Sequence, residues 1–358
     1  MSIIKKVVII GGGFAGSKAA RKLQNKCNVT LIDTEDFFEY TPGILRVLVE
    51  PNHYKKININ HGDYLNKTKV IVGIVSRITD KKIFLSDGKR FDYDYLVIAS
   101  GSSYAFPIKE ENVFFAKRFK HLLEAYEKIK KSQKIAIVGG GIVGVELAAE
   151  LATHYKNKEI LLVHSHSRLM ERNNPVTGDY ARNFLERRGV KIIFDEKIVK
   201  SDKKNLVGKS GKKYSYDAVF FTVGITPNVK FMKNELSRFV SRGISVNEYL
   251  QLDGRSNIFV AGDVAGVNEE KTAQNAEKHG EIAAENILAL IEEREMNKYN
   301  SKKRIMVISL GKHSGVIEYK KFVMGGFIPS ILKTLIEKRV MWGLKFFRRS
   351  KKQCATSH

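Results

Sequence analysis

One pattern of glycines occurs twice in this chain. Residues 11–16 and residues 139–144 both follow the order Gly-Gly-Gly-x-x-Gly. An apolar run precedes each copy, and an alanine-bearing stretch and a second apolar run follow it. This order predicts a buried strand, a tight turn, a helix and a second strand. We therefore predict an α/β fold that contains two copies of one unit.

The glycines of each copy have separate roles in binding a phosphate. The first permits the turn, the third lets the backbone approach a pyrophosphate where a Cβ would block it, and the last lets helix and strand pack closely. The pyrophosphate then lies on free N–H groups at the positive end of the helix. We therefore predict two Rossmann-like dinucleotide-binding domains. The residues predicted to contact the dinucleotides are Gly11, Gly13, Phe14, Ala15 and Gly16 in the first copy, and Gly139, Gly141, Ile142, Val143 and Gly144 in the second.

The two copies differ at the end of their second strand. Asp33 ends that strand in the first copy, where a carboxylate can accept hydrogen bonds from a ribose 2′-OH. His164 holds the matching position in the second copy, with His166 and Arg168 close behind it. Because these side chains would not repel a 2′-phosphate, we predict that the second site accepts NADPH, alone or alongside NADH. The alternative is that the histidines lie on a solvated loop. No third ligand for a metal is evident beside the two histidines, so no metal site is predicted.

Three later segments resemble motifs of the pyridine nucleotide-disulfide reductase superfamily, whose members are flavoproteins with two dinucleotide sites. Residues 92–101 resemble the strand that leads back to the flavin, residues 216–228 its counterpart that closes the nicotinamide domain, and residues 257–263 the second flavin motif. The resemblance covers residues 3–290 and implies FAD in the first site and NADH or NADPH in the second. It also implies that Asp263 bonds the ribityl chain. The further positions that it assigns to cofactor binding are Ser100, Gly101, Gly224 and Gly262.

The cysteines narrow this resemblance. The chain contains only Cys27 and Cys354, so it lacks the redox-active cysteine pair of a disulfide reductase or a sulfide:quinone reductase. The cysteine-free members that it most resembles are the type II NADH dehydrogenases and the apoptosis-inducing-factor-like (ferroptosis-suppressor type) NAD(P)H:quinone reductases. The resemblance implies hydride transfer from NAD(P)H to FAD and then transfer of two electrons to a quinone, without a cysteine relay.

Three residues are candidates for the chemistry itself. Gln274 and Lys278 lie in a segment that resembles the Ala-Gln helix bordering the quinone site of type II dehydrogenases, although a second glutamine would be expected where Lys278 stands. The same segment could be a helix N-terminus under the flavin ring. The resemblance places Glu146 near the nicotinamide, and a solvated helix acid is the alternative. Pro42 would shape the wall beside the isoalloxazine, or it would form a plain turn.

The chain is strongly basic, with a formal net charge of +24. Such an excess attracts phospholipid headgroups, nucleic acid or an acidic protein. Residues 327–349 predict an amphipathic helix with basic and aromatic side chains, which is the composition of an interfacial membrane anchor. The alternatives are packing on the protein's own core or on a second subunit in a homodimer. Because no secretory signal or long apolar run is evident, we predict a cytoplasmic protein that is peripheral to the inner face of the cell membrane.

We expect the FAD-binding domain to be split around the NAD(P)-binding domain. The predicted boundaries are 1–108 and 236–298 for the FAD-binding domain, 109–235 for the NAD(P)-binding domain, and 299–358 for a C-terminal α/β segment with the amphipathic helix. Two alternatives to quinone reduction remain. One is a reductase for an acidic electron-transfer protein such as ferredoxin. The other is a basic flavoprotein that binds nucleic acid, which no recognition module or basic-aromatic stripe supports.

Overall fold

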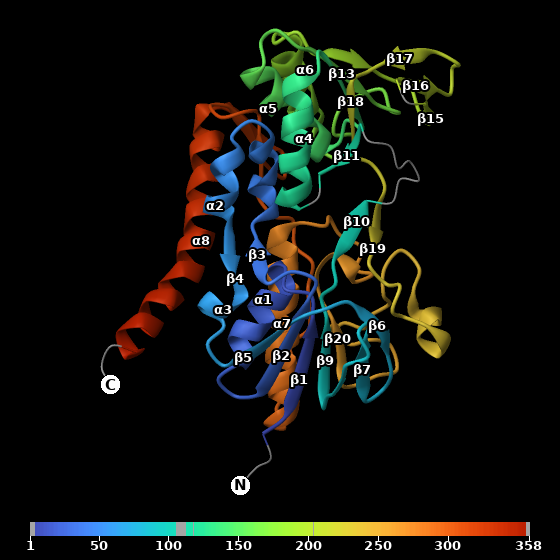
Figure 1. The fold of residues 1–358 in the computed structure, drawn as a ribbon. Coiled ribbons are helices and arrows are strands. Elements are labelled where there is room, and N and C mark those ends of the chain that lie inside the picture. Colours follow the sequence, from blue (N-terminus) through green and yellow to red (C-terminus); the bar gives the residue numbers. More distant parts are fainter. Residues whose placement is uncertain (1–3, 105–111, 117, 203, 356–358) are drawn as a thin grey trace.

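Two parallel sheets of five strands each form the centre of the protein. Figure 1 shows the computed structural model as a ribbon. The structure describes residues 4–104, 112–116, 118–202 and 204–355. Both sheets are mostly apolar and buried, as expected when both faces of a parallel sheet are covered. The predicted α/β class with two dinucleotide-binding units is therefore confirmed.

The first sheet has the strand order β20-β9-β1-β2-β5. Side chains alternate across it, so Val7 and Ile9 face the helices α1 and α7, while Val8 and Ile10 face a small antiparallel sheet. The strands of the first sheet are β1 (Lys6–Ile10), β2 (Asn28–Asp33), β5 (Thr68–Val72), β9 (Tyr95–Ile98) and β20 (Ile258–Val260). The elements that cover it are α1 (Phe14–Leu23), α7 (Ala273–Ile291), β6 (Val75–Ile78), β7 (Lys82–Leu85) and β8 (Arg90–Asp92).

The second sheet repeats this arrangement, with the strand order β11-β18-β12-β13-β14. Its strands are β11 (Val113–Phe115), β12 (Lys134–Val138), β13 (Glu159–Val163), β14 (Lys191–Ile193) and β18 (Ala218–Phe221). The elements around it are α4 (Phe119–Lys131), α5 (Ile142–His154), α6 (Pro175–Glu186) and the antiparallel strands β15 (Ile198–Asp202), β16 (Asn205–Gly208) and β17 (Lys213–Ser215).

Shorter elements connect and flank the two sheets. Strands β10 (Ser102–Tyr104) and β19 (Ile225–Pro227) pair antiparallel, so the chain leaves the first sheet and returns to it along one ribbon. Because β20 then joins β9, the first sheet is completed only after the second has been built. The remaining short elements are β3 (Phe37–Glu39), η1 (Thr41–Leu48), η2 (Pro51–His53), α2 (Tyr54–Ile57), β4 (Asn58–Asn60), α3 (His61–Tyr64), η3 (Asn234–Phe239) and η4 (Gly262–Val264).

The C-terminal segment is an antiparallel sheet followed by one long helix. It comprises β21 (Met306–Ser309), β22 (Gly315–Tyr319), β23 (Phe322–Gly326) and α8 (Phe327–Ala355). Helix α8 runs beside α2, β4 and α3, and its C-terminal part extends beyond them (Figure 1). In the described part of the chain, every helix is too short or too polar to cross a bilayer.

Candidate functional site

The first glycine turn forms a cradle with free backbone donors. Gly11 has a φ of +95°, and a Cβ on Gly16 would lie 1.8 Å from the carbonyl oxygen of Gly11. A Cβ on Gly13 would meet no atom within 4 Å, so open space lies over the start of α1. No side chain caps this helix, and its first N–H groups therefore remain available to a phosphate. Phe14 and Ala15 form the first turn behind this opening.

Asp33 lies beside this cradle at the end of β2, as predicted. Its Oδ2 accepts a hydrogen bond of 2.5 Å from the backbone N–H of Gly12, and its side chain is almost fully buried. Burial acts to raise the pKa of Asp33, but His61, Arg118 and the Gly12 N–H together hold that pKa below its usual value. The carboxylate is therefore charged and can accept hydrogen bonds from ribose hydroxyls.

A buried chain of hydrogen bonds supports Asp33 from behind. Ser17 Oγ donates to the carbonyl of Gly12 over 2.6 Å, so it accepts from Tyr64 Oη at 2.7 Å. Tyr64 Oη in turn accepts from Nδ1 of His61 at 2.7 Å, and Nε2 of the same ring lies 3.6 Å from Asp33 Oδ2. A Cβ on Gly12 would lie 2.4 Å from His61 Nε2. The middle glycine is therefore required by a histidine that the sequence analysis did not single out.

The flavin-side motifs meet at the N-terminal end of α1, beside the cradle. Gly262, with a φ of +80°, donates its N–H to His279 Nδ1 over 3.1 Å. Asp263 Oδ2 accepts a hydrogen bond of 2.8 Å from the hydroxyl of Ser102. A Cβ on Gly280 would lie 2.1 Å from the carbonyl oxygen of Ala15. The segments predicted to close over the cofactor are thus brought to one place. Ser100 exchanges hydrogen bonds of 2.8 Å with Asn228, and Gly101 and Gly224 adopt φ values of +67° and +75°.

The second glycine turn has the same geometry as the first. Gly139 has a φ of +112°, and a Cβ on Gly144 would lie 1.9 Å from the carbonyl oxygen of Gly139. The space around Gly141 is open, and α5 begins without a side-chain cap. Ile142 and Val143 form the first turn of that helix and are half-buried. The second turn therefore has the geometry that the predicted binding of a pyrophosphate requires.

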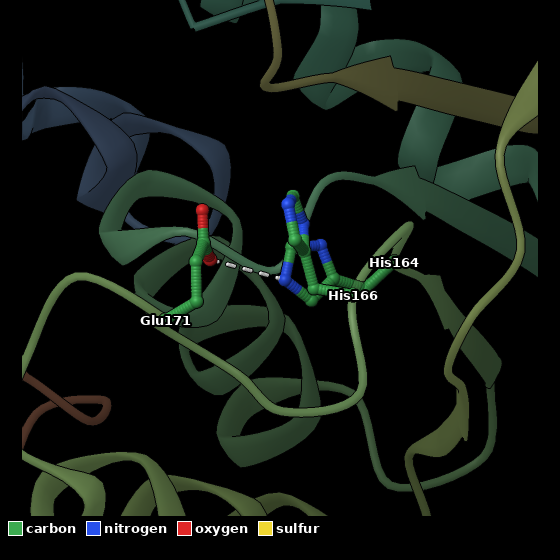
Figure 2. Close-up of side chains that lie close together, drawn as sticks. All are labelled: His164, His166 and Glu171. Atoms are coloured by element: carbon green, nitrogen blue, oxygen red, sulfur yellow. Dashed lines mark hydrogen bonds and ion pairs between the residues drawn. The ribbon is translucent and has the colours of Figure 1, made fainter.

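His164 occupies the strand-end position of the second cradle, and it is not a solvated loop residue. Its ring is 5% exposed, and Nδ1 accepts the backbone N–H of Gly140 over 3.0 Å. Because Nδ1 is the acceptor, the ring proton lies on Nε2, which faces Glu171 Oε2 at 3.2 Å (Figure 2). Burial lowers the pKa of His164. Glu171 is thus a third polar side chain beside His164 and His166. It lies seven residues after His164 and was not predicted from the sequence.

Arg168 does not point into this site as a free cation. Its guanidinium donates to the carbonyl of Glu171 and, over 3.0 Å, to the carbonyl of Asn173. These bonds hold the loop that carries Glu171. The arginine therefore shapes the loop.

Glu146 lies on α5 and is tied to the C-terminal segment. Its Oε1 accepts the N–H of Ser309 over 2.7 Å and also a hydrogen bond from Lys333 of α8. The residue as a whole is 8% exposed, so it is not a solvated helix acid. Glu146, Lys333 and Pro42 line one small cavity of about 30 Å³, which is large enough for a water molecule.

Gln274 and Lys278 lie one turn apart near the start of α7. Gln274 Nε2 donates to the carbonyl of Ile305 over 3.1 Å, which joins α7 to the segment before β21. Lys278 pairs with Glu281 on the same helix at 3.0 Å and is 40% exposed. The helix is capped by Thr272 Oγ1, which accepts the N–H of Asn275. Both predicted residues therefore have partners within the protein.

Comparisons with known proteins agree with this geometry. The pyridine nucleotide-disulphide oxidoreductase family matches residues 5–280. The chain is 33% identical to apoptosis-inducing factor homolog A of Dictyostelium discoideum, over 92% of this chain and 89% of the relative.

Two solved structures show the same fold. The sulfide:quinone oxidoreductase of Aquifex aeolicus is similar with a TM-score of 0.84 at 19% identity, over 96% of this chain and 92% of that one. NDH2 of Plasmodium falciparum in complex with NADH is similar with a TM-score of 0.86 at 17% identity, over 96% of both chains. The chain therefore belongs to the pyridine nucleotide-disulphide oxidoreductase family, and it is an oxidoreductase that uses FAD and NAD(P)H.

Proposed function

We propose that this protein is an NAD(P)H:quinone oxidoreductase that works at an anionic membrane surface. The observation that carries the proposal is the pair of open cradles at Gly13 and Gly141, together with a helix α8 that contacts the site through Lys333 and exposes an apolar stripe. A quinone is named as the substrate of the sulfide:quinone oxidoreductase that shares this fold, and NADH is bound in the NDH2 structure.

FAD, when bound, accepts a hydride from the nicotinamide and passes two electrons onward. The protein's own contribution is to hold and orient the two nucleotides. Asp33 would accept hydrogen bonds from the ribose hydroxyls of FAD, and Asp263 would bind its ribityl chain. The N-terminus of α5 takes the pyrophosphate of the nicotinamide nucleotide.

Reduction of a quinone also consumes two protons. Glu146 and Lys333 hold an exchangeable proton within a buried hydrogen bond, next to Pro42 and a cavity that can admit water. We assign this pair to the acceptor side of the site, and Gln274 and Lys278 to the border of the quinone. Cys27 is buried, and burial raises the pKa of its thiol, which fits a mechanism without a cysteine relay.

The exposed face of α8 has the composition of a membrane-binding surface. Five apolar residues of this face are between 51% and 66% exposed: Phe327, Ile331, Leu335, Trp342 and Phe346. Met341 and Leu344 lie on the opposite face and are buried against the protein. A contiguous exposed apolar stripe on one helix marks an interaction surface.

Basic side chains flank this stripe. Lys338, Arg339 and Lys345 are exposed, whereas Lys333 is held in the ion pair with Glu146 and is not available to a membrane. Each exposed Lys or Arg near an anionic leaflet adds about 1 kcal/mol of attraction. Together with insertion of the aromatic side chains, this attraction is sufficient for reversible binding.

The test uses purified, FAD-loaded protein with NADH or NADPH, and compares a short-chain quinone with an acidic ferredoxin as acceptor. We expect rapid quinone-dependent oxidation of the nicotinamide, and co-sedimentation with anionic but not with zwitterionic vesicles. Turnover with ferredoxin and no turnover with quinone would replace the proposal with the ferredoxin reductase alternative. Quinone turnover without vesicle binding would remove the membrane part only.

A further inference from the structure

We propose that Glu171 selects a nicotinamide nucleotide with a free ribose 2′-OH over one with a 2′-phosphate. This inference rests on the proposed function, because it requires that the cradle at Gly141 binds the nicotinamide nucleotide. The residue type at the strand end predicts tolerance of NADPH. The three-dimensional position of Glu171 indicates the opposite preference.

The two cradles contain the same pair of groups in opposite order. In the first, a carboxylate accepts the N–H of the second glycine and an imidazole lies behind it, as Asp33 and His61 do. In the second, the imidazole of His164 accepts the N–H of Gly140, and the carboxylate of Glu171 lies behind it at 3.2 Å. The loop after the second strand of this unit thus supplies the acidic side chain that the strand end itself lacks.

The carboxylate is held charged and accessible. Burial acts to raise the pKa of Glu171, but a backbone hydrogen bond and the neighbouring His164 and His166 keep the pKa below its usual value. Its side chain is 32% exposed, so a ligand can reach it. A 2′-phosphate placed beside it would meet a like charge, whereas a 2′-OH would find an acceptor.

The basic residues near the strand end are balanced by acids or bound to other groups of the protein. A hollow of about 460 Å³ next to Ser165 is lined by Lys197 and Lys209, but also by Asp195 and Glu196, so its formal charges cancel. Arg168 is engaged with two backbone carbonyls. Arg168 keeps its positive charge, but its bonds to these carbonyls hold it in the loop. A ligand at the strand end therefore meets the partly exposed carboxylate of Glu171, although the chain as a whole is strongly basic.

The alternative ligand of His164, His166 and Glu171 is a metal ion. Their donor atoms lie within 4.8 Å of one another (Figure 2). A neutral histidine that binds a metal through Nε2 must keep its proton on Nδ1, and that proton would face the N–H of Gly140 at 3.0 Å. The hydrogen bond from Gly140 therefore opposes metal binding and favours the proton on Nε2 that Glu171 accepts.

The test is calorimetric titration of NAD⁺ and NADP⁺ into FAD-loaded protein pretreated with EDTA, which needs no turnover. We expect the native protein to bind NAD⁺ more tightly, by on the order of tenfold, because of the like-charge contact. Glu171→Gln keeps a hydrogen-bond acceptor and removes the charge, so it should tighten NADP⁺ binding by a similar factor and change NAD⁺ binding little. Glu186→Gln, on the exposed face of α6, is the matched control and should change neither.

The remaining outcomes distinguish failure of this inference from failure of the proposed function. An unchanged NAD⁺ to NADP⁺ ratio in Glu171→Gln, or tighter binding of NADP⁺ by the native protein, would overturn the inference and leave the oxidoreductase intact. Failure of the native protein to bind either nucleotide would instead overturn the assignment of the second cradle. Stoichiometric Zn²⁺ binding to the native protein that Glu171→Gln abolishes would overturn the inference in favour of the metal.

Discussion

Lys333 of α8 donates a hydrogen bond to the carboxylate of Glu146, on the helix that opens the second glycine cradle. The helix with the exposed apolar stripe is thereby fixed to the helix that would bind the nicotinamide nucleotide. The proposed docking surface and the proposed electron-transfer site thus share one ion pair, whose side chains are 17% and 10% exposed.

Lys333→Met should destabilise the protein. The substitution leaves the Glu146 carboxylate with Ser309 as its remaining donor, and removal of one partner from a largely buried pair costs about 3 kcal/mol. Urea unfolding measures the change. The double variant Lys333→Met/Glu146→Gln should recover part of the loss, and Lys338→Met, at an exposed position on the same helix, serves as the control. Equal stability of the Lys333 and Lys338 variants would show that the pair is not structural.

His61→Gln should weaken retention of FAD. The imidazole joins Asp33 to Tyr64, so its loss leaves the ribose-binding carboxylate without its buried partner. His61 Nε2 faces Asp33 at 3.6 Å, which is a charge contact and not a hydrogen bond, and its loss should raise the Kd of FAD by roughly tenfold. Recovery of flavin fluorescence on dilution gives the Kd. His121→Gln, on the exposed face of α4, is the control, and an FAD Kd that is the same in both variants would contradict the role of His61.

Glu39 should make the protein less stable as the pH rises from 4.5 to about 7. Glu39 is 2% exposed, and burial raises its pKa to about 7. The N–H of Phe119 and the charge of Arg118 act in the opposite direction and lower this pKa. Because the pKa in the folded state exceeds the unfolded value of 4.5, the folded protein binds the proton more tightly. The free energy of unfolding therefore falls between pH 4.5 and about pH 7, by roughly 3 kcal/mol.

Glu39→Gln removes the charge and keeps an acceptor for Phe119. It should therefore abolish this part of the pH dependence and raise stability at pH 8 relative to the native protein. Urea unfolding at pH 5 and pH 8 with saturating FAD makes the comparison. Glu124→Gln, at an exposed position of α4, should leave the dependence in place. The same slope in Glu39→Gln and in the native protein would refute the assignment.

Leu335→Glu should release the protein from anionic vesicles. The substitution places a charge in the centre of the apolar stripe, where Leu335 is 55% exposed and therefore contributes little to folding. We expect a loss of vesicle binding of at least about tenfold, with oxidation of NADH by a short-chain quinone unchanged. Val176→Glu, at a residue of α6 that is 58% exposed, should bind vesicles normally. Binding that survives in Leu335→Glu would assign the stripe to another partner, and a shift from dimer to monomer would identify that partner as a second copy.

The local features of this protein could be predicted from its sequence. The two glycine turns, the strands around them and the start of each following helix depend on backbone conformation and on the absence of Cβ atoms, and both are properties of single residues at fixed spacing. Asp33 could be placed for the same reason, because the end of a strand is defined by the residues that precede it.

Only the tertiary structure decided which side chains meet across elements. It placed His61 behind Gly12, Lys333 on Glu146 and Glu171 against His164. None of these contacts follows from a spacing, because each depends on how separately formed helices, strands and loops pack against one another. The sequence thus determined that two dinucleotides are held, whereas the packing decided which charges surround them, since electrostatic interactions depend on distance in space and not on distance along the chain.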